Sequence, residues 1–393
     1  MKELVEICFW ICIFIVVYAY VGYGFLLFLL VKIKRAFGAP KIAPSISNYP
    51  EITHVIAAYN EDECIRQKIE NSLNLDYPAD KLKVLIVTDG STDETMNIIK
   101  SYPQVLHYHE DNRNGKIAAV NRVIRFVKSP VVVFSDANTT LNDDAIKNIV
   151  RHFNNPKVGL VAGEKRVISK NADGAAASGE GFYWKYESKL KQWDSELHSV
   201  VGAAGELFAI RTDLFDPVDE NIIIEDFYIS LKIAMNGRKV EYEPAAYAME
   251  SGSASVKEEL KRKIRIAAGG IQAIVKLAPL LNIFKYGMLS FQYISHRVLR
   301  WTLAPLALPV IFFTNFYLAL NGSQLYQLIF ELQVLFYLFS AIGWVLQNNN
   351  LKFKIFFIPY YFSMMNYAVY RGFLRYIKGT QSAVWDKAKR AQA

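Results

Sequence analysis

An uncharged run near the start of the chain constrains its fold more than any other feature. From Ile7 to Val31 no residue is charged, and the run is followed by Lys32, Lys34 and Arg35. A helix needs roughly 20 apolar residues to cross a bilayer, and this run is longer. No small-residue cleavage site follows it, so residues 1–35 are expected to be a retained anchor and not a signal peptide.

The end of the chain, residues 301–378, is expected to form a second membrane region. Two apolar segments cover about residues 302–320 and 325–346, and the turn signal Asn-Gly-Ser lies between them. Each segment is long enough to cross the bilayer as a helix. We therefore expect two spans here.

A third apolar segment, residues 355–377, is compatible with two placements, across the membrane or along its surface. Its uncharged part is short for a span and contains Pro359 and Asn366. A third span would also export the basic tail 379–393, which the positive-inside rule would keep in the cytoplasm. We favour an interfacial or re-entrant segment.

Residues 50–270 have the mixed charges of a soluble domain, while residues 271–300 are apolar with widely spaced charges. The second stretch indicates helices lying on membrane lipids. Basic residues flank the membrane segments on the side of the domain, which places the domain in the cytoplasm. We expect the protein in a bacterial inner or plasma membrane. The net charge of +8 is then mostly membrane-flanking, and no basic stripe indicates nucleic acid.

Strand-like and helix-like patterns alternate within the soluble domain. The apolar runs 52–58, 83–87 and 131–134 are each followed by a polar turn, and helical spacing follows the first two. This alternation is typical of an α/β fold in which helices wind around a parallel sheet. Ligands bind such sheets beyond the carboxyl ends of the strands, where these polar turns lie. The same polar residues also suit turns and helix N-caps.

Six short motifs in this region resemble those of a known family. In chain order they are "AAYNEDE", "VTDGSTDET", "NGKIAAVN", "VVVFSDAN", "IIIEDFYIS" and "RKIRI". They resemble the ordered motifs of membrane-embedded family 2 glycosyltransferases, the branch that includes cellulose, hyaluronan and poly-N-acetylglucosamine synthases. The resemblance implies a GT-A-like (Rossmann-like) domain with N- and C-terminal transmembrane helices. It also implies a UDP-sugar donor and inversion at the anomeric carbon.

Besides the metal ligand Asp136, the resemblance assigns a donor site to five residues. Tyr59 would stack on uracil, while Glu61 and Asp89 would bond to the base or the ribose. Lys116 and Asn121 match a Lys…Asn pattern that contacts the donor. For Lys116, a solvated side chain in a glycine-rich turn is the alternative.

The resemblance also implies a divalent cation at the motif "SDAN". Mg²⁺ or Mn²⁺ takes oxygen ligands and binds through one or two carboxylates together with substrate phosphates. Asp136 is the expected ligand, and it would also contact the donor. Relatives usually carry a second aspartate two residues later, where this chain has Asn138. The asparagine supplies a carbonyl oxygen but no charge.

The catalytic residues are expected at the last two motifs. Asp226, beside Glu225, matches the family's general base, with helix N-capping as the alternative. Arg262 and Arg265 lie three residues apart on one helical face and could clamp the departing diphosphate. The same basic segment could instead rest on lipid headgroups.

The expected function is metal-dependent transfer of a sugar to a membrane-associated glycan. Transfer to a lipid such as a polyprenyl phosphate or ceramide is the alternative within the enzyme class, and a non-catalytic sugar-binding or scaffold protein is the alternative outside it. Ile266 stands where chain-making relatives carry a tryptophan that stacks on the acceptor. The expectation is therefore short products, or an export partner or homo-oligomer that completes a channel. Trp184, Tyr183 or Phe284 could supply the stacking instead.

Overall fold

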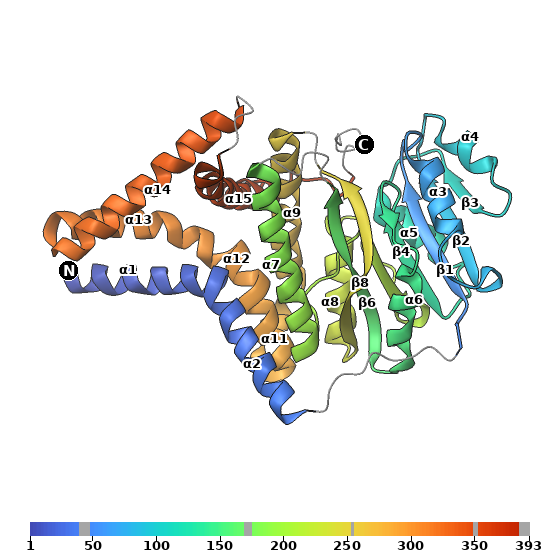
Figure 1. The fold of residues 1–393 in the computed structure, drawn as a ribbon, viewed down its shortest axis with the longest axis horizontal. Helices are drawn as coiled ribbons and strands as arrows, with labels where there is room; N and C mark the ends of the chain where they lie inside the picture. Colours follow the sequence, from blue (N-terminus) through green and yellow to red (C-terminus); the bar gives the residue numbers. More distant parts are fainter. Residues whose placement is uncertain (39–47, 169–174, 253–254, 349–352, 385–393) are drawn as a thin grey trace.

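The computed structural model describes residues 1–393 except 39–47, 169–174, 253–254, 349–352 and 385–393. A globular α/β domain lies at one end of the molecule, and long helices project from the other end (Figure 1). Helices α7 (Ala175–Leu197) and α9 (Val256–Lys276) lie between the two parts, and both pack against the same C-terminal helix.

In the described part of the chain, eight strands form one mixed sheet in the order β3-β2-β1-β4-β7-β6-β8-β5. The first four in this order are parallel: β3 (Leu106–Glu110), β2 (Leu82–Asp89), β1 (Ile52–Ala58) and β4 (Val131–Asp136). The other half comprises β7 (Leu207–Arg211), β6 (Val158–Ile168), β8 (Lys239–Ser251) and β5 (Thr140–Leu141). Strand β7 runs antiparallel to both β4 and β6, whereas β6 and β8 are parallel to each other, so β7 interrupts the common strand direction in the middle of the sheet. The α/β fold predicted from the sequence is confirmed. The antiparallel strand β7 was not predicted.

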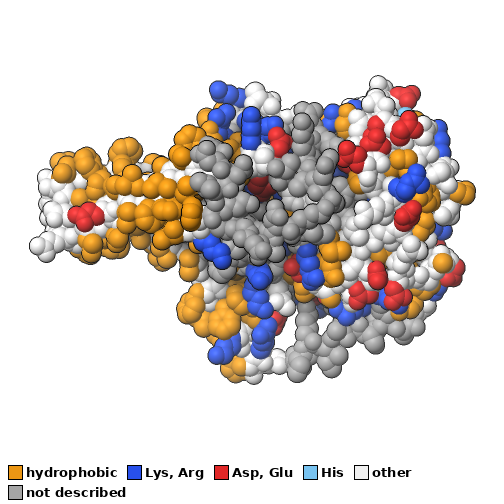
Figure 2. Space-filling model, turned by 45° about the horizontal axis from the view of Figure 1, so that its top comes forward, with side chains coloured by type: hydrophobic (Ala, Val, Ile, Leu, Met, Phe, Trp, Pro, Cys, Tyr) orange, Lys and Arg blue, Asp and Glu red, His pale blue; other side chains and the backbone are white. Residues whose placement is uncertain are grey.

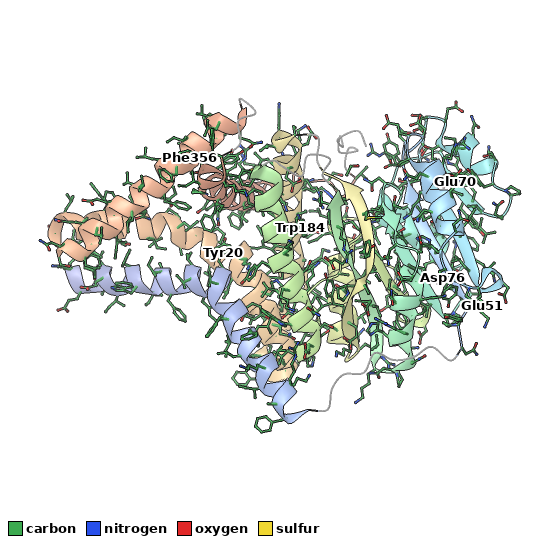
Figure 3. All side chains as sticks on the ribbon, in the orientation of Figure 1. Tyr20, Glu51, Glu70, Asp76, Trp184 and Phe356 are labelled. Carbon is green, nitrogen blue, oxygen red and sulfur yellow. The ribbon has the colours of Figure 1, made fainter. Side chains whose placement is uncertain are left out.

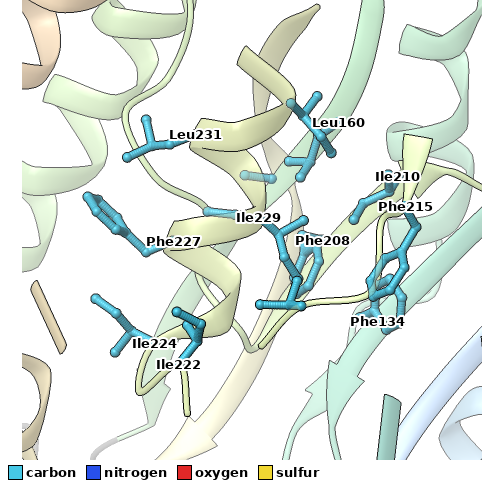
Figure 4. Packing of buried hydrophobic residues seen from close by; sticks show 14 of the residues in the cluster. Phe134, Leu160, Phe208, Ile210, Phe215, Ile222, Ile224, Phe227, Ile229 and Leu231 are labelled. Carbon is cyan, nitrogen blue, oxygen red and sulfur yellow. The ribbon is translucent and has the colours of Figure 1, made fainter. Parts of the chain in front are cut away.

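Short helices cover the sheet and carry polar residues to its edge. They are α3 (Ile65–Leu73), α4 (Thr95–Lys100), α5 (Lys116–Ile124), α6 (Ala145–Val150) and α8 (Glu225–Met235). Beneath α8, the rings of Phe134 and Phe208 stack with centres 5.0 Å apart, and Phe215 closes the same cluster (Figure 4). Burying such large apolar side chains stabilises each by about 1.5–3 kcal/mol. Helix α8 contributes Phe227 and Ile229 to the same cluster and packs against β8 and β6.

Three described helices are long and apolar enough to cross a membrane, judged by length and composition. The first runs from Lys2 to Phe37 as α1 (Lys2–Val17), a π-helical turn η1 (Tyr18–Gly22) and α2 (Tyr23–Phe37). The others are α13 (Leu303–Asn321) and α14 (Gln324–Asn348). Figure 2 shows a largely hydrophobic surface on the projecting helices and mixed charges on the globular part. The helix bends where α1 meets α2, as π-helical turns commonly cause (Figure 1).

Short helices connect α9 to α13, where the sequence predicted interfacial helices. They are η5 (Ala278–Leu281), α10 (Ile283–Tyr286), α11 (Met288–Tyr293), η6 (Ile294–Val298) and α12 (Leu299–Trp301). The expected boundary at residue 270 lies inside α9. Helix α15 (Lys354–Ile377) packs along α9 and α14, and its Gly372 lies directly against Ala267 of α9.

Buried polar contacts fasten the first membrane helix to the globular part. The hydroxyl of Tyr23 on α2 donates to Asp194 of α7. His296 of η6 contacts the same carboxylate through Nδ1 at 2.5 Å, and both side chains are fully buried. Truncating one partner of such a network leaves a buried charge unpaired, so these helices are held in a fixed relation to α7.

Candidate active site

A cavity of about 1080 Å³ opens at the carboxyl ends of β1, β2 and β4 and extends to α7, α8 and α9. Ten of the eleven site residues expected from the sequence line it: Tyr59, Glu61, Asp89, Lys116, Asp136, Asn138, Glu225, Asp226, Arg262 and Arg265. Asn121 is the exception. Residues from all six motifs therefore meet in one cavity.

Lys116, the first residue of α5, holds two of these motifs together. Its Nζ lies 2.6 Å from Asp136 Oδ1 and 3.1 Å from Glu225 Oε1. Against the effect of burial, these two carboxylates keep the pKa of Lys116 above its ordinary value. The solvated-turn alternative for Lys116 is wrong, because its ammonium bridges the end of β4 and the start of α8.

Asp226 lies in the first turn of α8 and faces the cavity. Helix α8 begins at Glu225, with Ile224 at the N-cap position and no side-chain cap, so Asp226 does not cap it. Burial, together with the neighbouring Glu225 carboxylate, raises the pKa of Asp226 to about 7. A Cβ on Gly205 would lie 3.5 Å from Asp226 Oδ2, so the glycine keeps the space beside this carboxylate open.

Asp89 is bonded to the protein through both carboxylate oxygens. The backbone N–H groups of Asn114 and Gly115 donate to Oδ2 at 2.8 and 2.6 Å, and Arg122 donates to Oδ1 at 3.0 Å. Charge-assisted bonds of this kind are stronger than neutral ones. Asp89 thus shapes the loop before α5, a task that the sequence pattern did not indicate.

Tyr59 has an arginine on its ring. The guanidinium carbon of Arg113 lies 3.8 Å from the ring centre, which is cation–π geometry. Arg113 lines the cavity beside Tyr59 and places a positive charge there. The sequence analysis missed Arg113, which comes three residues before Lys116.

Asn121 does not line the cavity, so its predicted contact with the donor is not supported by its position. Its Nδ2 donates to the carbonyl of Val218 at 2.6 Å, and the N–H of Val218 donates to its Oδ1 at 3.1 Å. The side chain thus joins α5 to the loop that leads to α8. Its spacing from Lys116 puts it on the far side of α5 from the cavity.

Replacing Asn121 with alanine should lower stability and leave nucleotide affinity unchanged. Losing both bonds to Val218 should cost about 1–3 kcal/mol, because the backbone groups lose their partner. Thermal unfolding and calorimetric titration with UDP would measure the two effects. Loss of UDP affinity at an unchanged melting temperature would restore Asn121 to the donor site.

The two arginines of α9 differ in their partners. Arg262 lies 3.2 Å from Glu206 and 3.7 Å from Glu259, while Arg265 donates to the carbonyl of Ile223 at 3.2 Å. Arg265 therefore braces the segment that leads into Glu225. Both guanidinium groups line the cavity and could contact a departing diphosphate.

The sequence analysis largely missed the half of the cavity that lies away from the strand ends, here called the far half. Trp184, Glu187 and Lys191 of α7 line it together, and Trp184 is labelled on that helix in Figure 3. Their spacing of three and four residues places them on one helical face, and this periodicity could have identified them. Ile266 and Trp301 also line the cavity, whereas Phe284 is 99% exposed and does not. The expectation of an aromatic platform from Phe284 is wrong. The side chain of Tyr183 lies outside the described residues.

The segment after α15 returns to the cavity. Thr380, Gln381, Ser382 and Val384 line it, and a Cβ on Gly115 would lie 3.1 Å from the Val384 side chain. The end of α15 therefore lies on the same side as the globular domain.

Asp136 and Asn138 fit a divalent cation in their chemistry. Both line the cavity at the end of β4, and together they offer carboxylate and carbonyl oxygens, the ligands that Mg²⁺ and Mn²⁺ prefer. No group of three or more His, Cys, Asp or Glu side chains suited to a metal occurs among the described residues. Water molecules and the oxygens of a bound substrate would supply the remaining ligands of a cation here.

Comparison with known proteins gives consistent results. Residues 53–218 match the family described as Glycosyl transferase family 2. A poly-β-1,6-N-acetyl-D-glucosamine synthase of Staphylococcus epidermidis is 25% identical over 295 residues, which cover 67% of this chain and 70% of the relative. The probable glycosyltransferase YdaM of Bacillus subtilis is 25% identical over 253 residues, covering 60% of this chain and 59% of YdaM.

A solved structure shares the whole fold. The mannosyltransferase PcManGT from Pyrobaculum calidifontis, in complex with GDP-Man and Mn²⁺, superposes with a TM-score of 0.69 at 21% identity, covering 94% of this chain and 99% of that one. The similarity in fold thus extends over the sheet and over the helices that are apolar enough to cross a membrane. With its family 2 domain and this GT-A-like architecture, the chain is a glycosyltransferase.

Proposed function

We propose that this glycosyltransferase moves a sugar from a UDP-linked donor, with inversion, to a hydroxyl group of a membrane-associated glycan. One observation carries the proposal: Lys116, Asp136, Glu225 and Asp226 line a single cavity, with Lys116 bonded to both Asp136 and Glu225. The cavity thus combines Asp136, whose oxygens could bind a cation, with Asp226, a buried carboxylate whose pKa is raised. Inverting transfer needs a general base, and a cation bound at the oxygen ligands would stabilise the departing diphosphate.

In this proposal the donor occupies the half of the cavity that lies at the ends of β1, β2 and β4. Tyr59, with Arg113 on its ring, is positioned for the nucleotide base, and the loop held by Asp89 lies beside it. Asp136 and Asn138 would hold a divalent cation, which when bound neutralises charge on the departing diphosphate. Lys116 adds a fixed positive charge next to Asp136.

Asp226 acts as the general base. Its carboxylate takes the proton of the acceptor hydroxyl while that oxygen attacks the anomeric carbon, and the bond from this carbon to the diphosphate breaks. UDP leaves with the electron pair of that bond. A base with a pKa near the working pH is well suited to this task.

The rate of transfer should rise with pH and level off above about 7. Asp226 accepts a proton only when it is ionised, and its pKa is raised to about 7, so the acid limb lies below that pH. We expect kcat/KM to fall by about tenfold for each pH unit well below the pKa. A profile of kcat/KM from pH 5.5 to 8.5 at saturating metal would measure this. A flat profile would contradict the assignment.

We also propose that the globular domain and the end of α15 lie together on the cytoplasmic side. Residues after α15 line the catalytic cavity, so α15 rests beside α9 and does not cross the bilayer. In a variant lacking Cys8, Cys12 and Cys64, a cysteine introduced as Lys378→Cys should escape an impermeant maleimide in intact cells. Ser323→Cys, between α13 and α14, is the matched control and should react. Labelling of the Lys378→Cys variant in intact cells would mean that α15 spans the membrane.

The proposed donor and acceptor can be tested with membranes that contain the protein. A panel of radiolabelled UDP-sugars, with UDP-N-acetylglucosamine first because of the staphylococcal relatives, should label a membrane-bound product. Gel filtration of that product gives its length. We expect short chains, because Ile266 lines the cavity where chain-making relatives carry a tryptophan that stacks on the acceptor. Labelling from GDP-mannose alone would refute the UDP donor.

A further inference from the structure

The far half of the cavity contains a pair of cations that the proposed transfer does not use. Lys191 of α7 and Arg297 of η6 both line it, and the Arg297 guanidinium lies 5.9 Å from the centre of the Trp301 ring. Lys191 is only 8% exposed. Both residues lie on helices, and neither lies at the strand ends where the proposed donor residues are found.

Lys191 lacks the partner that a buried ammonium normally has. Among the described residues its Nζ makes no hydrogen bond or ion pair, and its recorded contact is with the face of Tyr242, 5.9 Å from the ring centre. Burial, together with the charge of Arg297, lowers the pKa of Lys191. Burying a charge without a partner is costly, and an anion entering the cavity would offset that cost.

Nearby carboxylates do not neutralise the pair. Glu187 lies 2.6 Å from Arg297 but also 3.2 Å from Arg300, so one carboxylate serves two guanidinium groups. Asp226 and Glu206 also act on Lys191. However, Asp226 is the proposed base, and Glu206 lies 2.5 Å from Lys165 and 3.2 Å from Arg262. This end of the cavity keeps an excess of positive charge.

The position of the pair indicates where its ligand comes from. Arg297 and Trp301 lie just before α13, a helix apolar enough to cross the membrane. Met365, Ala368 and Val369 of α15 give the same cavity an apolar wall. An anion bound here would therefore lie at the membrane boundary, next to apolar surface. A lipid that carries a phosphate has this combination of chemistry.

We propose that Lys191 and Arg297 form a second anion subsite, which binds the phosphate of a membrane lipid that carries the acceptor hydroxyl. The inference rests on the proposed function, because it assigns the acceptor class of the same cavity. Arg297 supplies a planar donor fork suited to phosphate, and Lys191 supplies a point charge. The lipid phosphate would hold the acceptor while its hydroxyl reaches Asp226.

Dihexanoyl phosphatidic acid, a soluble lipid with a terminal phosphate, is a suitable probe. The full-length protein in neutral detergent would be saturated with UDP and Mg²⁺, so that the donor half is filled, and then titrated calorimetrically. Dihexanoyl phosphatidylcholine and inorganic phosphate are the comparison ligands. The variants are Lys191→Met, Lys191→Arg and the control Lys189→Met, which removes an exposed lysine of the same helix that does not line the cavity.

The phosphatidic acid should bind to the wild type, to Lys189→Met and to Lys191→Arg. Lys191→Met should weaken this binding by about tenfold or more, since a charge-assisted bond is lost. Both comparison ligands should bind more weakly than phosphatidic acid. UDP affinity, measured separately, should be the same in all variants.

Three results would overturn the subsite: equal phosphatidic acid affinity in the two methionine variants, equal affinity of inorganic phosphate, or a loss of UDP affinity in Lys191→Met. The last would move Lys191 into the donor half. If the wild type fails to bind UDP, the proposed function is refuted. If the wild type binds UDP but Lys191→Met binds phosphatidic acid as tightly as the wild type does, only the subsite is refuted.

Discussion

The Asp226→Asn variant should bind its donor normally and transfer sugar roughly 10²–10⁴ times more slowly than the wild type, the usual cost of removing a general base. The amide keeps the size of the carboxylate but cannot take the acceptor proton. Because the substitution also removes the like charge beside Glu225, the local structure should be preserved or slightly stabilised. Initial rates at saturating donor, together with calorimetric UDP affinity, would separate the chemical step from binding.

Asp219→Asn is the matched control for this variant. Asp219 is an acid of the loop before α8, but it pairs with Lys276 at 2.9 Å and does not line the cavity. Its replacement should leave the transfer rate unchanged. If both variants transfer sugar at the wild-type rate, Asp226 is not the base.

The Asp136→Ala variant should lose metal-dependent donor binding. Removing the one carboxylate of the proposed cation site should weaken UDP binding in the presence of Mg²⁺ by about 100-fold or more, since such a cation contributes several kcal/mol. Titrations with Mg²⁺ and with EDTA separate the cation from the Lys116 ion pair, which Asp136→Ala also breaks. The difference between the two titrations should vanish in the variant. Equal UDP affinity in Mg²⁺ and EDTA for the wild type would contradict a cation site.

The Asn138→Asp variant should change metal affinity in the opposite direction. An added carboxylate beside Asp136 strengthens the attraction for a divalent cation, so the Mg²⁺ concentration that gives half-maximal activity should fall. Without metal, two adjacent carboxylates repel the diphosphate, and UDP affinity in EDTA should fall as well. An unchanged metal requirement would place Asn138 outside the coordination sphere.

The parallel half of the sheet and its polar edge were predictable because their signals are local. The apolar runs that form β1, β2 and β4 each end where a polar cluster begins, and parallel strands bring those clusters to one edge. The strands of the other half of the sheet gave weaker signals. Strand β8 contains Pro244, and its parallel register with β6 shifts between Gly163 and Glu164.

The roles of individual polar residues were less predictable, since they depend on partners far away in the chain. Asn121 fitted a motif, yet its bonds go to Val218, 97 residues later. Lys191 belongs to no motif, and its proposed role depends on where α7 meets η6. Spacing along one helix identifies a shared face, but not what that face meets.

The anomeric configuration of the product tests the central claim most directly. Purified full-length protein, Mg²⁺ and an α-linked UDP-sugar would be incubated with a membrane extract, and the isolated product would be examined by NMR. The account predicts a β-linked product that forms only with metal and only when Asp226 is intact. A product that keeps the α configuration, or one formed equally well by Asp226→Asn, would contradict it.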